Sequence, residues 1–173
     1  TIMSKMAEYG RGGMVSASRE EAAQIGIEIL QKGGNAFDAA AAVSLALSVC
    51  EPQMSGLGGG GFATVHCAAS NKNVFVDFRE VAPEYAEPSI WATDENGALV
   101  NDDKMLGGKS VCVPGTLAGI CHILEEYGTM PLHRIIEPAI QLAFDGYMVD
   151  SLLSGDIAAH IPEMKRFAEP GNV

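Results

Sequence analysis

The sequence contains the segment Ser55-Gly56-Leu57-Gly58-Gly59-Gly60-Gly61-Phe62, followed closely by Asp77-Phe78-Arg79-Glu80. Five of the six residues from 56 to 61 are glycine. Glycine loses more backbone entropy on folding than any other residue, so such a run favours a loop that another group must approach closely. Arg79 supplies a planar cation whose shape matches a carboxylate. Together the two segments indicate a small anionic substrate.

The flanks of this glycine loop (residues 55–62) predict a helix before it and a strand after it. Residues 36–50 contain only three polar side chains, so they predict a centrally buried helix, which Asn35 caps and Pro52 ends. Residues 62–67 and 74–78 are rich in β-branched and aromatic side chains and predict a β-hairpin. The loop is therefore expected to join a buried helix to a core strand.

The loop also fits a dinucleotide-binding pattern, with Asp77 near the position of the ribose-binding acid. That site requires a strand before the glycines and a helix after them, with the helix N-terminus facing the pyrophosphate. The expected order here is the reverse, which argues against nucleotide binding. A purely structural tight turn is the other alternative for the loop.

Helix and turn signals predict further elements. Ser18 and Glu21 form a capping-box pattern that opens a helix ending at Gly33-Gly34. Downstream, the sequence predicts a long surface excursion over 82–108, a short strand over 109–113, a helix from Pro114-Gly115 to Tyr127, and a helix from Pro131 that Pro138 breaks or kinks. After Asp150 the helical pattern weakens.

Composition bounds the class of protein. The chain has 173 residues, of which 47% are hydrophobic, so it can bury a core as one domain or part of one. Eleven basic and 22 acidic residues give a formal charge of −11, which disfavours nucleic acid and anionic membranes as partners. No apolar run reaches the ~20 residues of a membrane span, and the first six residues lack a signal-peptide core.

The cysteines and histidines predict no metal site. Cys50, Cys67, Cys112 and Cys121 form no Cys-x-x-Cys pair, and all four lie in apolar segments. Their even number permits disulfides without requiring them. His66 is expected to be a half-buried strand residue, and no role is assigned to His122, His133 or His160. Glu51 and Ser55 flank the loop, where capping and turn bonding explain them.

Several motifs in fixed order resemble one family. They are Gly33-Gly34-Asn35-Ala36-x-Asp38-Ala39-Ala40, the glycine loop, Asp77-Phe78-Arg79-Glu80-x-Ala82-Pro83, Val113-Pro114-Gly115-Thr116-x-Ala118-Gly119, Tyr127-Gly128-Thr129-Met130-Pro131-Leu132 and Asp145-Gly146. Over residues 12–150 this order resembles the front part of the large subunit of the γ-glutamyltranspeptidase (glutathione hydrolase) family.

The resemblance implies an α+β fold that is part of an αββα sandwich of the N-terminal nucleophile hydrolase type. Residues 1–173 would then form a single incomplete domain, the N-terminal portion of the large subunit of a self-cleaving precursor. The family attacks γ-glutamyl amides with a threonine at the start of the small subunit, whose own amino group is the base. That threonine is expected beyond this chain, so the chain alone is predicted to be inactive, with no catalytic residue, cofactor or metal of its own.

Arg79 is the one site residue that the resemblance assigns. It matches the family's substrate-binding arginine, which holds the α-carboxylate of the glutamyl group. The alternative is that Arg79 pairs only with Glu80, Asp77 or another internal acid. Thr1 is not expected to be the nucleophile, because Ile2-Met3 follows it where the family has Thr-His.

The implied partners are a γ-glutamyl small molecule such as glutathione and the small subunit that carries the threonine. Without that subunit, an uncovered apolar face around residues 36–78 predicts self-association. Alternatives are a related acylase acting on β-lactam side chains or poly-γ-glutamate, and a non-catalytic degenerate homologue. Family members are often periplasmic or extracellular, but localisation stays open.

Overall fold

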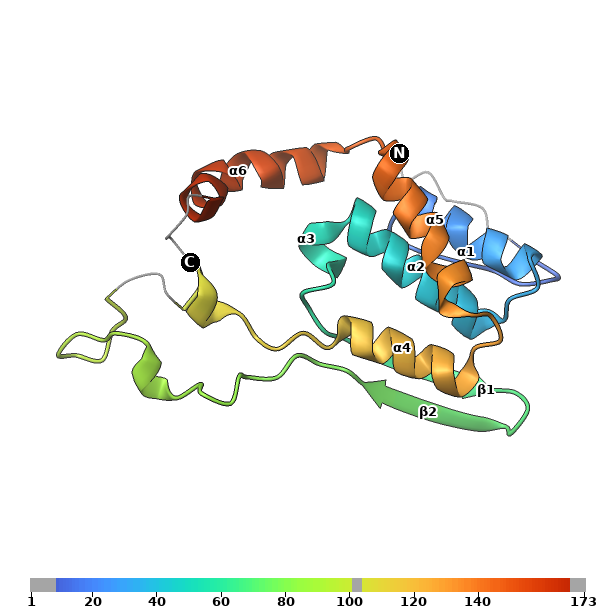
Figure 1. The fold of residues 1–173 in the computed structure, drawn as a ribbon, viewed down its shortest axis with the longest axis horizontal. Helices are drawn as coiled ribbons and strands as arrows, with labels where there is room; N and C mark the ends of the chain where they lie inside the picture. The colour runs from blue at the N-terminus through green and yellow to red at the C-terminus, as the bar shows by residue number, and fades with distance from the viewer. Residues whose placement is uncertain (1–8, 101–103, 169–173) are drawn as a thin grey trace, which may run out of the picture. The chain divides into compact units, whose positions relative to one another are not determined.

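The computed structural model describes residues 9–100 and 104–168. The elements are, in chain order, α1 (Glu20–Gln31), α2 (Ala36–Cys50), α3 (Pro52–Ser55), β1 (Phe62–Cys67), β2 (Lys72–Asp77), the 3-10 turns η1 (Pro88–Ile90) and η2 (Gly108–Ser110), α4 (Thr116–Tyr127), α5 (Leu132–Asp145) and α6 (Ser151–Ala168) (Figure 1). They divide into two compact units, Thr1–Gly56 with Ile120–Tyr147, and Leu57–Gly119 with Met148–Val173.

The core of the first unit is built around α2, which contacts both α1 and α5 (Figure 1). The alanines of α2 let the neighbouring helices approach closely, and a Cβ built on Gly26 of α1 would lie 2.6 Å from Val43 Cγ2. Buried core residues are Ala22, Ile25, Ile29, Ala39, Ala41, Ala42, Leu45, Ala46, Cys50, Ile120, Ile135 and Ala139. The expected central helix is confirmed.

A buried carboxylate, Asp38, joins the start of α2 to the turn between α4 and α5 in this unit. Asn35 caps α2 as expected, and its backbone N–H donates to Asp38 Oδ2 at 2.8 Å. From the turn between α4 and α5, the Thr129 hydroxyl donates to Oδ2 at 2.6 Å and the Met130 N–H donates to Oδ1 at 3.2 Å. Asn35 Nδ2 donates to the Tyr127 carbonyl at 2.7 Å. Asp38 is 0% exposed, so these bonds replace its hydration.

The hydrogen bonds also set the charge state of Asp38. Burial alone would raise the pKa of Asp38, but the donors from Thr129, Asn35 and Met130 together hold it below the ordinary value of 3.8. The native state therefore binds this proton less readily than the unfolded chain does. The stabilisation is complete above the unfolded-state pKa and is lost as pH falls through the folded-state pKa.

We expect Asp38→Asn to reduce the free energy of unfolding by about 2 kcal/mol at pH 7, because an amide cannot accept from all the donors that surround the carboxylate. The difference from the wild type should shrink toward pH 3, because the unfolded chain there takes up the proton that the native carboxylate resists. Denaturant unfolding at the two pH values measures both effects. Asp145→Asn, at an exposed position on α5, is the control. Equal loss of stability in both variants would contradict this role of Asp38.

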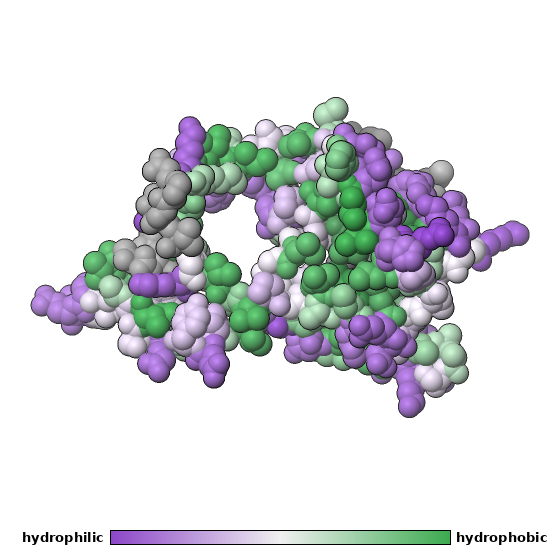
Figure 2. All heavy atoms as spheres, in the orientation of Figure 1, coloured by the Kyte–Doolittle hydropathy of each residue, from purple (hydrophilic) through white to green (hydrophobic). Residues whose placement is uncertain are grey.

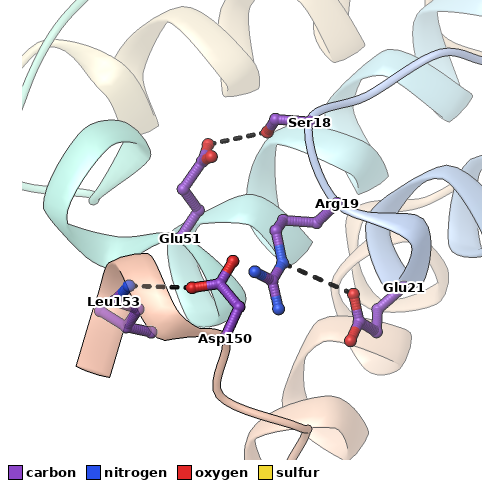
Figure 3. Close-up of polar contacts among 6 residues, drawn as sticks. All are labelled: Ser18, Arg19, Glu21, Glu51, Asp150 and Leu153. Carbon is purple, nitrogen blue, oxygen red and sulfur yellow. Dashed lines mark hydrogen bonds and ion pairs between the residues drawn. The ribbon is translucent and has the colours of Figure 1, made fainter. Parts of the chain in front are cut away.

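The capping box expected at Ser18 is wrong. Helix α1 begins at Glu20 with Arg19 as its N-cap, and no side chain caps it. The Ser18 hydroxyl instead donates to Glu51 Oε2 at 2.8 Å, and Arg19 Nε lies 3.7 Å from Glu21 Oε2 (Figure 3). Both members of the expected box are thus engaged elsewhere, since charged partners outcompete a local turn.

Of the break or kink expected at Pro138, the break is absent. Helix α5 continues through Pro138, with Ile135 and Ala139 buried on either side of it. Burial of this face offsets the roughly 3 kcal/mol that an internal proline costs. Helix α6 is an addition to the prediction: Asp150 Oδ1 accepts the Leu153 N–H at 2.8 Å at its start (Figure 3). Asp150 could have been recognised as a helix cap from the sequence, but Gly155 and Pro162 weaken the helical pattern after it.

The second unit contains the expected hairpin, in which β1 pairs antiparallel with β2 from Phe62↔Asp77 to Cys67↔Lys72. Strand β2 begins two residues earlier than predicted and ends at Asp77. The connection takes Asn71 into the left-handed region, at φ 51°. The strand expected over 109–113 is wrong, because Gly108–Ser110 is a 3-10 turn and Val113 makes only an isolated bridge to Val81. Residues 82–100 are irregular and largely exposed, as predicted.

One face of the hairpin is buried or half-buried, and the other is exposed. Val76 is 8% exposed, whereas Phe62 and Phe75 are 56% and 61% exposed and stack with ring centroids 5.6 Å apart. Figure 2 shows further hydrophobic residues on the surface of the described chain. An exposed aromatic pair on a two-stranded ribbon with unpaired edges is a typical site of association.

The isolated 173-residue chain should therefore self-associate in a concentration-dependent manner, measured by sedimentation velocity. Changing Phe62 and Phe75 together to Ser should shift the distribution toward monomer, because it removes the stacked pair. Phe144→Ser alters a single exposed aromatic on α5 and should change little. If the unaltered chain stays monomeric as its concentration is raised, the exposed face of the hairpin does not drive self-association.

Candidate functional site

Three segments of the second unit meet at the glycine loop. Gly61 and Phe78 exchange backbone hydrogen bonds, Phe78 N–H to Gly61 O at 3.0 Å and Gly61 N–H to Phe78 O at 3.3 Å. These bonds extend the β1–β2 pairing by one residue. The Gly59 carbonyl accepts the N–H groups of Gly115 and Thr116, at 2.9 and 3.1 Å. The loop is thereby fastened both to the segment that carries Arg79 and to the start of α4.

Glycines allow these three segments to approach closely, because glycine has no side chain. A Cβ on Gly115 would overlap the Phe78 carbonyl oxygen, and a Cβ on Gly119 would overlap the Phe78 side chain. A Cβ on Gly60 would overlap the backbone nitrogen and the carboxylate of Glu80. The close approach expected of the glycine loop is therefore present, and the approaching group is the Phe78–Glu80 segment.

Arg79 lies on this anchored backbone with its side chain 61% exposed. Its backbone N–H donates to Asp77 Oδ1 at 2.9 Å, and its Nη2 lies 3.2 Å from Glu80 Oε1. Exposed ion pairs of this kind contribute little to stability, about 0–1 kcal/mol. The pairing with Glu80 considered from sequence is thus present, and it leaves the guanidinium accessible to a ligand.

Glu80 is a residue that sequence reasoning considered only as an ion-pair partner. Its side chain is 23% exposed, and its Oε2 atom is buried without a hydrogen-bond partner among the residues that the structure describes. The carboxylate occupies the space that a side chain on Gly60 would fill. Only the adjacency of Glu80 to Arg79 could have suggested this placement, because the contact with Gly60 depends on tertiary structure.

The dinucleotide alternative does not fit the geometry. The elements around the loop are α3 before it and β1 after it, which is the reverse of a nucleotide-binding turn. The first N–H groups of α4 do face the loop, but the Gly59 carbonyl already accepts two of them. Asp77 caps the Arg79 N–H and so has a local partner.

The remaining candidates have structural explanations. Glu51 Oε2 accepts both the Ser18 hydroxyl and the Ser55 hydroxyl, so Glu51 and Ser55 stabilise the turn as expected. His66 is exposed rather than half-buried, since it lies on the outward face of β1, where Nδ1 and Asn73 Oδ1 are 2.8 Å apart. His160 Nδ1 lies 3.9 Å from Glu163, and His122 and His133 are exposed. Thr1 lies outside the described residues.

Within residues 9–100 and 104–168, no three metal-binding side chains cluster, and no helix is long and apolar enough to cross a bilayer. All four cysteines are free. Burial raises the pKa of the Cys50 thiol, whereas hydrogen bonds from Ser70 lower the pKa of Cys67. Neither thiol adjoins Arg79 in sequence.

Comparisons with known proteins show what this chain is similar to. The model of the Gamma-glutamyltranspeptidase family matches residues 22–172. A glutathione hydrolase proenzyme of Bacillus subtilis is 41% identical over 95% of this chain, and an acylase ACY 1 proenzyme of a Pseudomonas species is 37% identical over 94%. The chain spans 28% and 29% of the length of these two relatives.

A solved structure gives the same result for the fold. The γ-glutamyltranspeptidase of Helicobacter pylori superimposes with a TM-score of 0.83 at 35% identity, covering 97% of this chain and 50% of that chain. The α+β class and the N-terminal nucleophile hydrolase type of fold, of which this chain forms part, are thereby confirmed. The matching motifs, the anchored Arg79 segment and these comparisons lead to one conclusion: the chain belongs to the γ-glutamyltranspeptidase family.

Proposed function

We propose that this chain is the front part of the large subunit of an enzyme that cleaves γ-glutamyl amides and transfers the glutamyl group to water or to an acceptor amine. The observation that carries the proposal is the exposed Arg79 guanidinium on a backbone fixed by the glycine loop. The 41% sequence identity between this chain and a glutathione hydrolase proenzyme supports glutathione as a substrate.

Arg79 would bind the α-carboxylate of the glutamyl group through a charge-assisted pair, bidentate if two N–H groups on one edge of the guanidinium donate to the two oxygens. A free α-carboxylate distinguishes a γ-glutamyl amide from an ordinary peptide. A fixed cation left without that partner is an energetic cost, so Arg79 would select as well as bind. Glu80 Oε1 would share the guanidinium and hold it over the site.

The bond-making group would come from the rest of the protein. A threonine hydroxyl in a small subunit would attack the γ-carbonyl carbon while its proton passes to the threonine amino group. The amine would leave with that proton, giving a glutamyl ester, and water or a second amine would then release the glutamyl group. The small subunit is accordingly the proposed protein partner of this chain.

A related acylase is the second candidate, because an acylase ACY 1 proenzyme is nearly as similar to this chain. An acylase acting on β-lactam side chains or on poly-γ-glutamate would use the same nucleophile on a different amide. Comparing turnover of a γ-glutamyl anilide with that of a β-lactam side-chain amide by the full-length protein separates the two. Preference for the second substrate would replace the first proposal. A full-length protein that is folded but turns over neither substrate would instead be a non-catalytic homologue.

The 173-residue chain alone should neither hydrolyse nor transfer γ-glutamyl groups, since the proposed nucleophile is not part of it. A chromogenic γ-glutamyl anilide gives the measurement, with the full-length protein as positive control. If the isolated chain turns over the anilide and Thr1→Ala abolishes that turnover, Thr1 is the nucleophile and the prediction is wrong.

In the full-length protein, Arg79→Ala should leave precursor cleavage intact. It should lower kcat/KM by the equivalent of about 2–5 kcal/mol, as for loss of one partner of a charge pair that the bound substrate would bury. Arg79→Lys should recover part of this loss, because a point charge cannot reproduce the guanidinium fork. A γ-amide that lacks the α-carboxylate should hardly distinguish these variants from the wild type.

Arg134→Ala removes an exposed arginine from α5 and is the matched control for Arg79→Ala. It should keep wild-type kinetics with both substrates. If Arg79→Ala blocks folding or processing while the surviving enzyme has normal kinetics, Arg79 serves only its ion pair with Glu80.

A further inference from the structure

Phe78 packs closely against residues that have no side chain. Its neighbours there are three glycines: Gly61 of the loop, and Gly115 and Gly119 at the start of α4. A Cβ on Gly61 would lie 2.9 Å from Phe78 Cε2 and 3.2 Å from Cζ, closer than carbon atoms pack. The other two glycines face the Phe78 carbonyl and the root of its ring. We call these three residues the Phe78 seat.

The Phe78 seat affects the position of Arg79, because Arg79 is the next residue in the chain after Phe78. The Arg79 side chain is 61% exposed, and its ion pair is with Glu80, the next residue, so that contact moves with the same backbone segment. Its backbone is held instead by its neighbours, Phe78 in the seat and Glu80 against Gly60. A displacement of Phe78 passes directly to the next Cα, about 3.8 Å away along a trans peptide. The guanidinium at the end of a long side chain moves with that Cα.

We propose that Gly61, Gly115 and Gly119 are positioning residues for Arg79: by lacking side chains they seat Phe78, and the seated Phe78 fixes where the guanidinium meets the substrate carboxylate. This inference rests on the proposed function of Arg79. It explains why glycines from two separate segments converge on one aromatic ring beside an arginine that is itself exposed.

The mildest test is Gly61→Ala in the full-length protein, because the new methyl group meets only the far edge of the ring. KM for a γ-glutamyl anilide should rise on the order of tenfold with a smaller change in kcat, since misplacing a binding group by a fraction of an ångström to about 1 Å weakens its contacts steeply. A γ-amide lacking the α-carboxylate should show little change. A general loss of structure would affect both substrates alike.

Two double variants test the path of the effect. Phe78→Leu removes Cε2 and Cζ, the atoms nearest to the new methyl group, so adding it to Gly61→Ala should lower KM again. In an Arg79→Ala background, Gly61→Ala should have no further effect on KM, because residues that act through one group are not additive. Additive effects of Gly61→Ala and Arg79→Ala would overturn the proposal.

Gly58→Ala is the matched control in the same loop, since a Cβ there meets nothing within 4 Å. An equal rise in KM for Gly58→Ala and Gly61→Ala would mean that the loop responds as a whole, and the proposal would be wrong. If Gly61→Ala yields no folded protein, Phe78→Leu alone replaces it: it should raise KM only for the substrate with the α-carboxylate, and an unchanged KM would refute the inference.

The same series separates the two proposals. If Arg79→Ala leaves KM unchanged, the proposed role of Arg79 fails and the inference fails with it. If Arg79→Ala raises KM but Gly61→Ala does not, Arg79 binds substrate and only the seat has been misassigned.

Discussion

The Asp38 carboxylate is the interaction on which the first unit depends. It accepts hydrogen bonds from the N-terminus of α2 and from the turn between α4 and α5, and it is fully buried. A buried charge is tolerated only where donors replace its water, so the peptide segments around it have little freedom to move. The apolar packing of α1, α2 and α5 supplies most of the stability, whereas Asp38 specifies which turn packs against which helix end.

In the second unit, glycine has the corresponding role. Gly59 supplies a carbonyl for the first N–H groups of α4, and Gly60, Gly61, Gly115 and Gly119 supply space. A hydrogen bond and an absent Cβ act together there: the backbone bonds require close approach, and only glycine permits it. The result is a rigid segment that presents an exposed arginine, which is the arrangement expected of a binding site on a fixed scaffold.

Sequence predicted the elements whose signals are local and strong. Asn35 and the almost entirely apolar run after it predicted α2, and the β-branched and aromatic residues over 62–67 and 74–78 predicted the hairpin. The capping box failed because a distant partner changed a local preference: Ser18 bonds to Glu51. At Pro138 the break is absent, because burial keeps α5 continuous.

For the site, the motif order singled out Arg79 and its neighbours as the proposed binding residues, because family motifs are contiguous in sequence. The packing of Phe78 against these glycines could not be predicted from the sequence, because Gly61 and Gly119 come together only in the folded chain. The ion pair between Arg79 and Glu80 was one of two alternatives that sequence left open, and the structure contains it without burying the arginine.

The bonds to Asp38 also constrain the order of events during synthesis. The Thr129 donor lies 91 residues after Asp38, and the intervening chain includes residues 57–119 of the other unit. While the ribosome makes that stretch, α2 can form but cannot bury its apolar surface against α5, and its carboxylate must stay hydrated. Until Thr129 and α5 emerge, the nascent chain therefore carries an almost entirely apolar helix that only α1 can cover, and exposed apolar surface of this kind favours chaperone binding.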